Sequence, residues 1–269
     1  MAELTLTNVT VNIPVGTEVK TLLQDVNLTV AKGEFVTVLG NNGAGKSTLF
    51  NAITGDMPVS GGTITLADQT LNGKRPEQRA RHIARVFQDP KMGTAPRMTV
   101  AENLLLASHR GQRLTLRSRG MTASKAALKT LAAKTGNGLA DALDKPTEQL
   151  SGGQRQALSL LMATMRKPDL LLLDEHTAAL DPHTSQAIMQ LTNEIVSDQQ
   201  LTCLMITHQV EDALRYGNRL IVLDAGKIVA DFDQAKKAAM SRDDVLAFFS
   251  KLKTSPRDGY LAISQRTRF

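Results

Sequence analysis

The sequence is poor in cysteine and in long apolar runs, and both shortages limit what kind of protein it encodes. Its one cysteine, Cys203, has no second cysteine with which to form a disulfide, which favours a reducing compartment. No stretch reaches the ~18 consecutive apolar residues of a membrane span, and the run 170–173 ends at an aspartate. The first residues lack the basic and apolar segments of a secretory signal, so we expect a cytosolic protein.

One segment of the chain, residues 103–140, contains no acidic and no aromatic residue. The charged residues of this stretch are all basic: Arg110, Arg113, Arg117, Arg119, Lys125, Lys129 and Lys134. One interpretation is a solvated helical face, and another is a surface beside anionic lipid headgroups, where each basic residue contributes about 1 kcal/mol. Nucleic acid ranks behind both, since no aromatic side chain is present to stack on bases. The net charge of +6 does not decide between them.

The periodicity of apolar residues predicts the secondary structure. Alternation over 4–13 and 22–30 predicts two half-exposed antiparallel strands. Short apolar segments predict buried strands at 35–39, 170–174, 203–207 and 219–223. Strands that alternate with helical patterns are typical of a parallel sheet, and the turn after residue 223 predicts a β-hairpin. Residues 90–165 have helical periodicity without a strand signal, which predicts an inserted helical subdomain.

A glycine-rich loop follows the strand at 35–39 directly. It consists of Gly40, Asn41, Asn42, Gly43, Ala44, Gly45, Lys46, Ser47 and Thr48. Its glycines let backbone N–H groups turn toward phosphate oxygens, and the next helix adds the positive end of its dipole. A strand, this loop and a helix in that order predict a phosphate-binding P-loop. Lys46 is then expected to reach the β- and γ-phosphates, and Ser47 to ligate Mg²⁺.

Two carboxylates follow the buried strand at 170–173. Asp174 and Glu175 come at its C-terminal end, where α/β sheets bind their ligands. Asp174 suits the Mg²⁺ site, through water, since Mg²⁺ keeps part of its hydration shell. Glu175 suits the polarisation of an attacking water. With the phosphate loop, the pair predicts hydrolysis of a nucleotide.

The segment Leu150–Gln154 makes this prediction specific. Its sequence Leu-Ser-Gly-Gly-Gln is similar to the signature of ABC ATPases, and the order of motifs resembles that family over about residues 3–232. In this family two subunits sandwich two ATP molecules head to tail. The resemblance implies that a second copy of the chain has its ATP capped by Ser151, Gly152, Gly153 and Gln154. The segment that follows can begin a helix that points at an anion.

Further positions match the family in the same order along the chain. The resemblance implies that Gln88 senses Mg²⁺ and the attacking water, and that its loop couples hydrolysis to a transmembrane partner. It also implies that Asp181 belongs to a loop that communicates across the dimer, and that His208 contacts the γ-phosphate. Three other histidines are interpreted as surface residues: His82, His109 and His183.

Two positions depart from the family pattern. The family usually stacks an aromatic side chain from the N-terminal strand region on adenine, but no aromatic residue precedes Phe35 and the matching place holds Ile13. The preference for ATP over GTP is therefore open. His176 stands where many members have proline. We interpret it as a substitution within a loop, with a role in tuning Glu175 as the alternative.

The combined prediction is an α/β fold: a P-loop NTPase core with an N-terminal antiparallel β subsheet and an inserted α-helical subdomain. We expect the core at 1–89 and 166–235, the helical signature subdomain at 90–165, and a C-terminal helix with a basic tail at 236–269. The resemblance implies an ATPase that uses ATP and Mg²⁺, forms a dimer and drives separate permease subunits. It would act in the cytoplasm at the inner face of the cell membrane, with no nucleic acid as partner.

The motifs do not by themselves say whether this ATPase drives import, drives export or acts outside transport. The stretches 87–96 and 174–181 resemble a bacterial subgroup of import ATPases that works with a separate substrate-binding protein, so an importer of small solutes, amino acids among them, is expected. The motor of an exporter and a soluble or regulatory ATPase are the alternatives. Between Gln88 and Ser151 there is no room for the coiled coil of chromosome-type members. A single cassette does not fit translation-type members, and one cysteine does not fit zinc-bearing repair members.

Overall fold

A computed structural model describes residues 2–112 and 121–254. Within them the chain forms two compact units, one of Met1–Pro76 with Thr202–Phe269 and one of Glu77–Leu201. Part of the basic stretch (Arg113, Arg117 and Arg119) and the predicted basic tail lie outside the described residues. No helix of the described ranges is long and apolar enough to cross a membrane.

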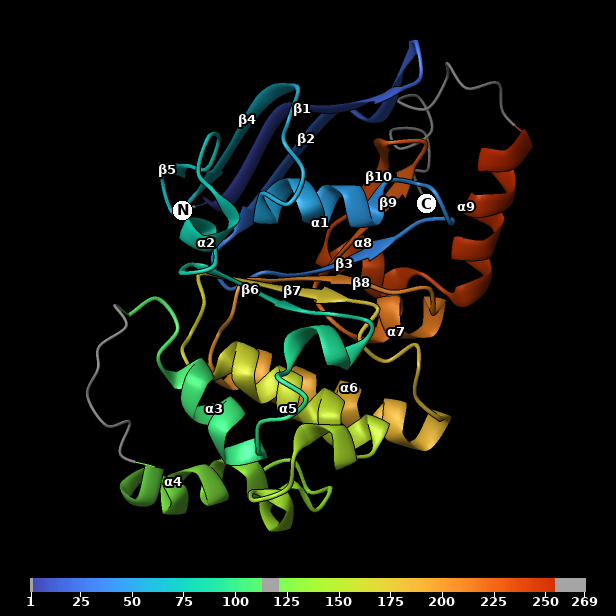
Figure 1. The fold of residues 1–269 in the computed structure, drawn as a ribbon. Coiled ribbons are helices and arrows are strands. Elements are labelled where there is room, and N and C mark those ends of the chain that lie inside the picture. Colours follow the sequence, from blue (N-terminus) through green and yellow to red (C-terminus); the bar gives the residue numbers. More distant parts are fainter. Residues whose placement is uncertain (1, 113–120, 255–269) are drawn as a thin grey trace. The chain divides into compact units, whose positions relative to one another are not determined.

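The first unit contains an antiparallel sheet with the strand order β2-β1-β4-β5 (Figure 1). Its strands are β1 (Ala2–Val15), β2 (Glu18–Ala31), β4 (Gly61–Leu66) and β5 (Gln69–Thr70). The alternating residues of β1 and β2 place one face in the core, where Leu4, Leu6 and Val11 are buried. The prediction of two antiparallel strands at 4–13 and 22–30 is confirmed.

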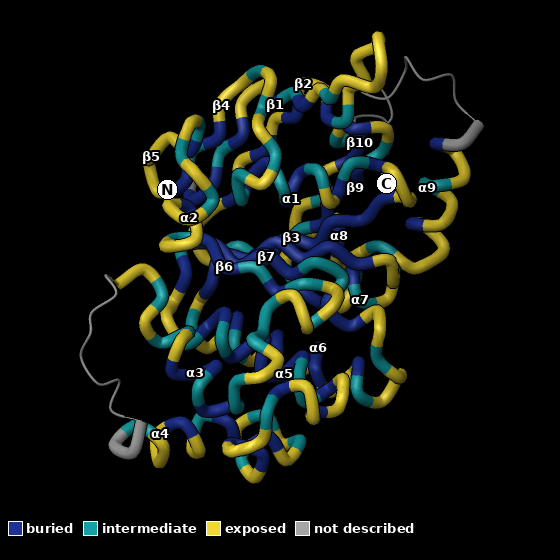
Figure 2. Tube along the Cα trace, viewed as in Figure 1, coloured by how far each residue is buried: buried dark blue, intermediate teal, exposed yellow. Residues whose placement is uncertain are grey.

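The same unit holds a second group of strands. They are β3 (Phe35–Leu39), β8 (Cys203–Ile206), β9 (Arg219–Asp224) and β10 (Lys227–Phe232). β3 lies between β8 and β9 and is parallel to both, whereas β10 pairs antiparallel with β9. All five side chains of β3 are buried (Figure 2), as expected for a strand inside a parallel sheet. The predicted buried strands and the hairpin are confirmed.

Helices complete this unit. They are α1 (Lys46–Thr54), α7 (Val210–Arg215), α8 (Gln234–Ala239) and α9 (Arg242–Thr254). α1 ends at Thr54, because Gly55 adopts a left-handed φ of 87° and caps the helix. α9 packs through an edge-to-face contact of Phe248 with Phe232 on β10, with ring centroids 5.9 Å apart.

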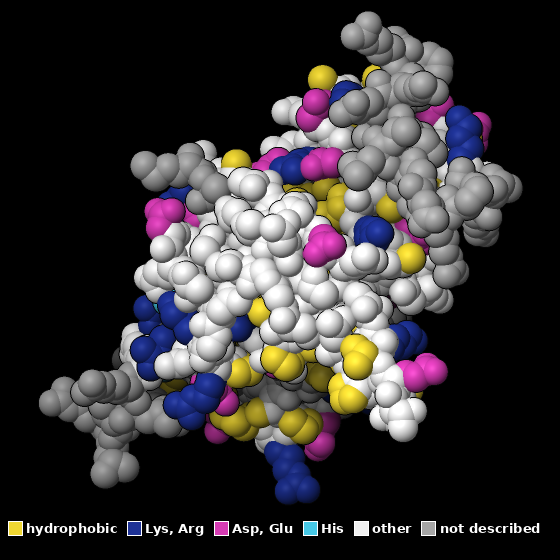
Figure 3. Space-filling model, turned by 90° about the horizontal axis from the view of Figure 1, so that it is seen from above, with side chains coloured by type: hydrophobic (Ala, Val, Ile, Leu, Met, Phe, Trp, Pro, Cys, Tyr) yellow, Lys and Arg dark blue, Asp and Glu magenta, His cyan; other side chains and the backbone are white. Residues whose placement is uncertain are grey.

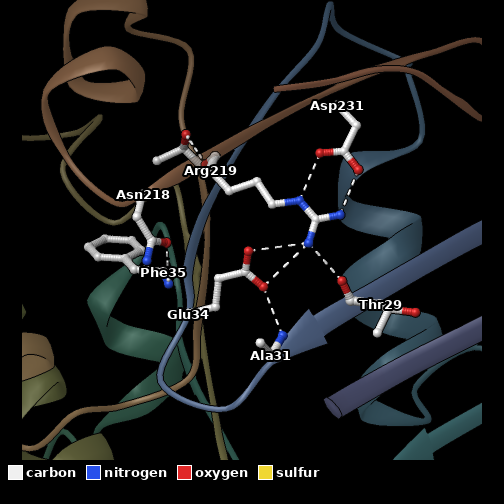
Figure 4. A network of polar contacts seen from close by, with 8 residues as sticks. Thr29, Ala31, Glu34, Phe35, Asn218, Arg219 and Asp231 are labelled. Atoms are coloured by element: carbon white, nitrogen blue, oxygen red, sulfur yellow. Dashed lines mark hydrogen bonds and ion pairs between the residues drawn. The ribbon is translucent and has the colours of Figure 1, made fainter. Parts of the chain in front are cut away.

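An arginine at the start of β9 ties the two groups of strands together (Figure 4). Arg219 donates two hydrogen bonds to Asp231 on β10, at 2.7 and 2.6 Å, and one to the carbonyl of Thr29 on β2, at 2.7 Å. It also pairs with Glu34, whose carboxylate accepts from the N–H of Ala31. These bonds, first of all those to Asp231, raise the pKa of Arg219. The network fixes β2 beside β9 and β10.

The second unit has a parallel pair of strands, β6 (Ile83–Val86) and β7 (Leu170–Asp174), and is otherwise helical. Its elements include α3 (Val100–Ser108), α4 (Met121–Ala133), α5 (Gly152–Thr164) and α6 (Pro182–Asp198), with short 3-10 turns at Pro90–Gly93, Leu139–Ala142 and Thr147–Gln149. The short helix α2 (Pro76–Arg79) begins at the last residue of the preceding unit. In the described part of 90–165, the elements are helices and 3-10 turns, with one isolated bridge between Thr99 and Pro146. The predicted helical character of this region is confirmed.

Some basic residues of the stretch 103–140 have partners within this unit. Arg110 donates to the carbonyls of Ala163 and Arg166, at 3.0 and 2.6 Å, and Lys125 pairs with Asp144 at 2.7 Å. Figure 3 shows Lys and Arg side chains gathered at one edge of the face that it draws. Contact between the basic residues of 103–140 and lipid headgroups stays a prediction.

His82 lies at the surface, as predicted, and has a polar partner there. Its Nδ1 lies 2.6 Å from the carboxylate of Asp169, and its side chain is 41% exposed. The partner is distant in the sequence, which is why the sequence alone gives no sign of the pair. His109 and His183 are exposed, as predicted.

Candidate functional site

The phosphate loop lies between the buried end of β3 and the start of α1. Gly45 adopts a φ of 103°, a conformation open to glycine and costly for residues with a Cβ. A Cβ at Gly40 would come within 2.5 Å of the carbonyl oxygen of Leu223 on β9. Both glycines are therefore required by the backbone path.

Lys46 folds back over this loop. Its ammonium donates to the carbonyls of Gly40, at 2.6 Å, and Asn41, at 3.1 Å, and the residue is 5% exposed. No acidic residue stands in the first turn of α1, so this turn itself adds no negative charge that would oppose an anion at the helix N-terminus. Ser47 is exposed at the start of the same helix.

A turn on the neighbouring hairpin supports the loop from behind. The N–H of Gly226, between β9 and β10, donates to the carbonyl of Ala44 at 2.9 Å. The carbonyl of Gly226 in turn accepts from Gln24 on β2, also at 2.9 Å. A Cβ at Gly226 would lie 2.5 Å from the carbonyl of Leu22. The sequence predicts this hairpin but not its role as a support of the phosphate loop.

Asp174, at the end of β7, is held by an arginine that the sequence analysis did not single out. Arg85 on β6 donates to its carboxylate at 2.5 Å, and the two side chains are only 12% and 13% exposed. The Arg85 guanidinium also lies over the ring of Phe87, 4.8 Å from its centroid. The strand register explains this contact. Arg85 pairs with Leu172 in the parallel ladder, and Asp174 is two residues further along β7, so its side chain points to the same face of the sheet as that of Leu172.

The donor set proposed for Mg²⁺ consists of oxygen ligands. Among the described residues, no three His, Cys, Asp or Glu side chains cluster as a metal cage. Mg²⁺ is usually held by one or two protein ligands together with phosphates and waters. The Ser47 hydroxyl, the Gln88 amide oxygen and the Asp174 carboxylate are hard oxygen donors of this kind.

Glu175 has an unusual backbone. Its φ is 46°, in the left-handed region that a residue with a long side chain enters at a cost on the order of 1 kcal/mol. Its carbonyl accepts from the N–H of Ala178 at 3.0 Å, which closes a turn. Such strain persists only where the surroundings hold it in place.

The next residue, His176, is anchored in the core of this unit. It is 2% exposed, and its Nε2 lies 3.0 Å from the hydroxyl of Thr192 on α6. Burial lowers the pKa of His176 to about 4, so the ring is neutral at pH 7. An ordinary substitution in an exposed loop would not show this burial or this partner.

The buried imidazole predicts a loss of stability in acid. Between pH 6.5 and 4 the unfolded chain binds a proton at His176 that the folded chain does not bind, so stability falls as the pH falls through this window. From pH 7 to 5 this one residue should lower the free energy of unfolding by about 2 kcal/mol. Denaturant titrations at both pH values should show a correspondingly smaller loss for His176→Gln. An equal loss in both proteins would contradict the buried neutral ring.

The signature segment begins α5 with a capping box. The Ser151 hydroxyl accepts from the N–H of Gln154, and the Gln154 side chain accepts from the N–H of Ser151, both at 3.2 Å. Ser151 and Gly152 are exposed at this helix start, whereas Gly153 is buried. The predicted helix start is confirmed.

Gly153 allows α5 to approach α6 closely. A Cβ there would come within 2.4 Å of the Thr184 Cγ2, whereas one at Gly152 would meet Leu180 at an ordinary 3.4 Å. Alanine normally favours a helix over glycine by about 1 kcal/mol. We expect Gly153→Ala to destabilise by about 1–3 kcal/mol despite this preference, because the core is overpacked.

Gly152→Ala serves as the matched control and should be neutral or stabilising in thermal unfolding. Adding Thr184→Ser, which removes the clashing methyl group, should restore most of the stability of Gly153→Ala. Equal effects of the two alanine substitutions would show that the contact with Thr184 does not decide the need for glycine.

The other predicted residues lie at element ends. Gln88 is exposed just after β6, and His208 is exposed just after β8. Asp181 caps α6, where its carboxylate accepts from the N–H of Thr184 at 3.0 Å. Hydrogen bonds from Thr184, first of all from its hydroxyl and then from its N–H, lower the pKa of Asp181. Ile13 is half-buried on β1. The loop, His208 and Ile13 belong to the first unit, and the remaining predicted residues to the second.

Comparison with known proteins decides the family. A model of the ABC transporter family matches residues 23–178, which include the phosphate loop, the signature segment and both carboxylates. The chain belongs to this family. As an ABC ATPase it binds ATP with Mg²⁺ and hydrolyses ATP, and its fold is that of a P-loop NTPase, as the sequence predicts.

Individual relatives match the sequence or the fold of this ABC ATPase over most of its length. It is 42% identical over 242 residues to a tyrosine transport ATP-binding protein of Clostridioides difficile, covering 86% of this chain and 92% of the relative. It is 35% identical to a thiamine import ATP-binding protein of Yersinia pestis, with 79% and 84% covered. Among solved structures, a dimeric ATP-binding cassette in a post-hydrolysis state with ADP and Pi has a TM-score of 0.73 at 27% identity, with 86% and 98% covered.

Proposed function

We propose that this ABC ATPase powers an importer of small solutes by driving a separate permease. The observation that carries the proposal is the 42% identity to a tyrosine transport ATP-binding protein across 92% of that relative. Relatives named for the import of phosphonates and of thiamine support import over export. An amino acid is the substrate class that the first of these relatives favours.

We propose the following roles at the nucleotide. The phosphate loop holds the phosphates, with Lys46 on the β- and γ-phosphates. Ser47 and Asp174 hold Mg²⁺, which neutralises phosphate charge when it is bound. Glu175 polarises the attacking water, Gln88 senses Mg²⁺ and this water, and His208 contacts the γ-phosphate.

The nucleotide is proposed to lie between two copies of the chain. The signature residues Ser151–Gln154 of one copy would cap the γ-phosphate held by the loop of the other, with Asp181 in the loop that links the two copies. The exposed start of α5 supports this role, because the positive end of a helix dipole attracts an anion. A solved cassette that is similar in fold is dimeric with ADP and Pi.

The aliphatic side chain of Ile13 is proposed to contact the adenine ring. This contact would replace the aromatic stacking usual in the family, and preference for adenine over guanine would then come from elsewhere. Outside the cassette, the proposed partners are permease subunits and a separate substrate-binding protein. The permease subunits would hold the ATPase at the cytoplasmic face of the membrane. Nucleic acid is not among the proposed partners.

Reconstitution tests the proposed function. The chain would be purified from its own membranes in mild detergent with its associated proteins, and the assembly placed in vesicles with radiolabelled amino acids. We expect ATP-dependent uptake from the side of the binding protein. Flux in the opposite direction would indicate an exporter, and purification without any multi-span protein would indicate a regulatory ATPase.

A further inference from the structure

The backbone of Glu175 is held from both sides. On its N-terminal side, Leu173 pairs with Val86 in the parallel ladder, and Asp174 is tied to Arg85. On its C-terminal side stands His176, buried against α6. The residue between these two fixed points is the one with a φ of 46°.

The direction of the His176 hydrogen bond follows from the partner. The Thr192 hydroxyl donates its single proton to the carbonyl of Ile188, one turn earlier in α6, at 2.8 Å. Its oxygen must therefore accept from His176, so Nε2 carries the proton. Thr192 is fully buried, so this bond lies away from the solvent-exposed surface.

We propose that His176 is a positioning residue, which keeps Glu175 in its left-handed conformation by anchoring the following peptide to Thr192 on α6. The inference rests on the proposed role of Glu175 in directing the attacking water. Relaxation of φ at residue 175 would swing the next peptide, and the buried bond to Thr192 opposes that movement. Proline, which many family members have at this position, has no donor for Thr192.

The obvious alternative is that His176 only fills space in the core. Both ideas predict lower stability when the bond is removed, because a buried polar group is left unsatisfied. Only positioning predicts a specific loss of catalysis, since small misplacements of a catalytic group can lower rates up to a hundredfold. Stability and kcat must therefore be measured on the same variants.

Thr192→Val removes the acceptor and keeps the shape of the side chain. We expect its kcat for ATP to fall by roughly ten- to a hundredfold, while ATP affinity measured by equilibrium binding changes little. Thr192→Ser keeps the hydroxyl and should restore kcat. His176→Ala should match Thr192→Val, and the double variant should be no worse than either single variant, because both remove one interaction.

Thr164 at the end of α5 offers a matched control. It is also buried, and its hydroxyl also donates to the carbonyl four residues earlier, that of Leu160, at 2.8 Å. The carbonyls of Leu160 and Leu161, which accept from this hydroxyl, lie in its own helix, whereas Thr192 also contacts His176. Thr164→Val should lower the thermal midpoint as Thr192→Val does and leave kcat unchanged. A crystal structure of Thr192→Val should show residue 175 outside the left-handed region.

The outcomes separate the inference from the proposed function. A normal kcat in Thr192→Val, beside an inactive Glu175→Gln, overturns the positioning role and leaves Glu175 in place. An equal fall of kcat in Thr164→Val and Thr192→Val also overturns it, because the effect is then one of stability. Turnover in Glu175→Gln like that of the unmodified protein overturns the proposed role of Glu175 and the inference together, and leaves the proposed transport function in place.

Discussion

Glu175→Gln should bind ATP almost as well as the unmodified protein and lose nearly all turnover. The amide cannot take a proton from the attacking water, and loss of a general base costs roughly a hundred- to ten-thousandfold in rate. The phosphate loop is untouched, so affinity should change by no more than a few-fold. Since the trapped ATP would keep two copies together, ATP and Mg²⁺ should produce a stable dimer in size-exclusion chromatography.

A matched control removes a carboxylate elsewhere in the same unit. Glu194 is exposed on α6 and accepts a hydrogen bond from Gln190 within the helix. Glu194→Gln should keep normal turnover. Near-normal hydrolysis by Glu175→Gln would show that another group directs the water, and the assignment of the catalytic carboxylate would fail.

Lys46→Ala should instead weaken nucleotide binding itself. Hydrogen bonds from a charged donor contribute about 1.5–3 kcal/mol each, so loss of the contacts to two phosphates should raise the Kd for ATP by at least about a hundredfold. The substitution also removes the bonds to Gly40 and Asn41 that close the loop on itself. Isothermal titration with ATP and Mg²⁺ measures the effect.

Lys32→Ala is the control for the loss of one positive charge. Lys32 is exposed between β2 and β3 in the same unit, so its removal should leave the Kd within about twofold, because exposed charges interact weakly with a ligand at a distance in salt. An ATP affinity in Lys46→Ala equal to that in Lys32→Ala would contradict the assigned role of the loop lysine.

The sequence predicts most of the strands, because their burial leaves a simple pattern. Alternation identifies β1 and β2, and continuous apolar runs identify β3 and β7. β6 is missed because Arg85 interrupts its apolar residues. That charge is tolerated in a half-buried position because Asp174 pairs with it, and a partner so distant in the sequence gives no local signal.

Some features of the candidate site can likewise be predicted from the sequence, and others cannot. Glycine spacing identifies the phosphate loop, and motif order identifies the carboxylates and the signature segment. The support of the loop by Gly226 depends on a meeting of β2 with the β9–β10 turn, which no local pattern encodes. The left-handed φ of Glu175 and the burial of His176 likewise depend on the packing of α6. Neither can be predicted from the residues around them.

Complementation between two inactive variants tests the central claim most directly. Lys46→Ala lacks the loop lysine, and Ser151→Arg obstructs the signature segment, so each alone should hydrolyse almost no ATP. A mixed dimer contains one site with an intact loop from one copy and an intact signature from the other. We predict that ATPase activity in an equimolar mixture rises well above the mean of the two variants. Activity that stays at this mean at every protein concentration would show that each copy hydrolyses ATP by itself, and the two-copy site would be wrong.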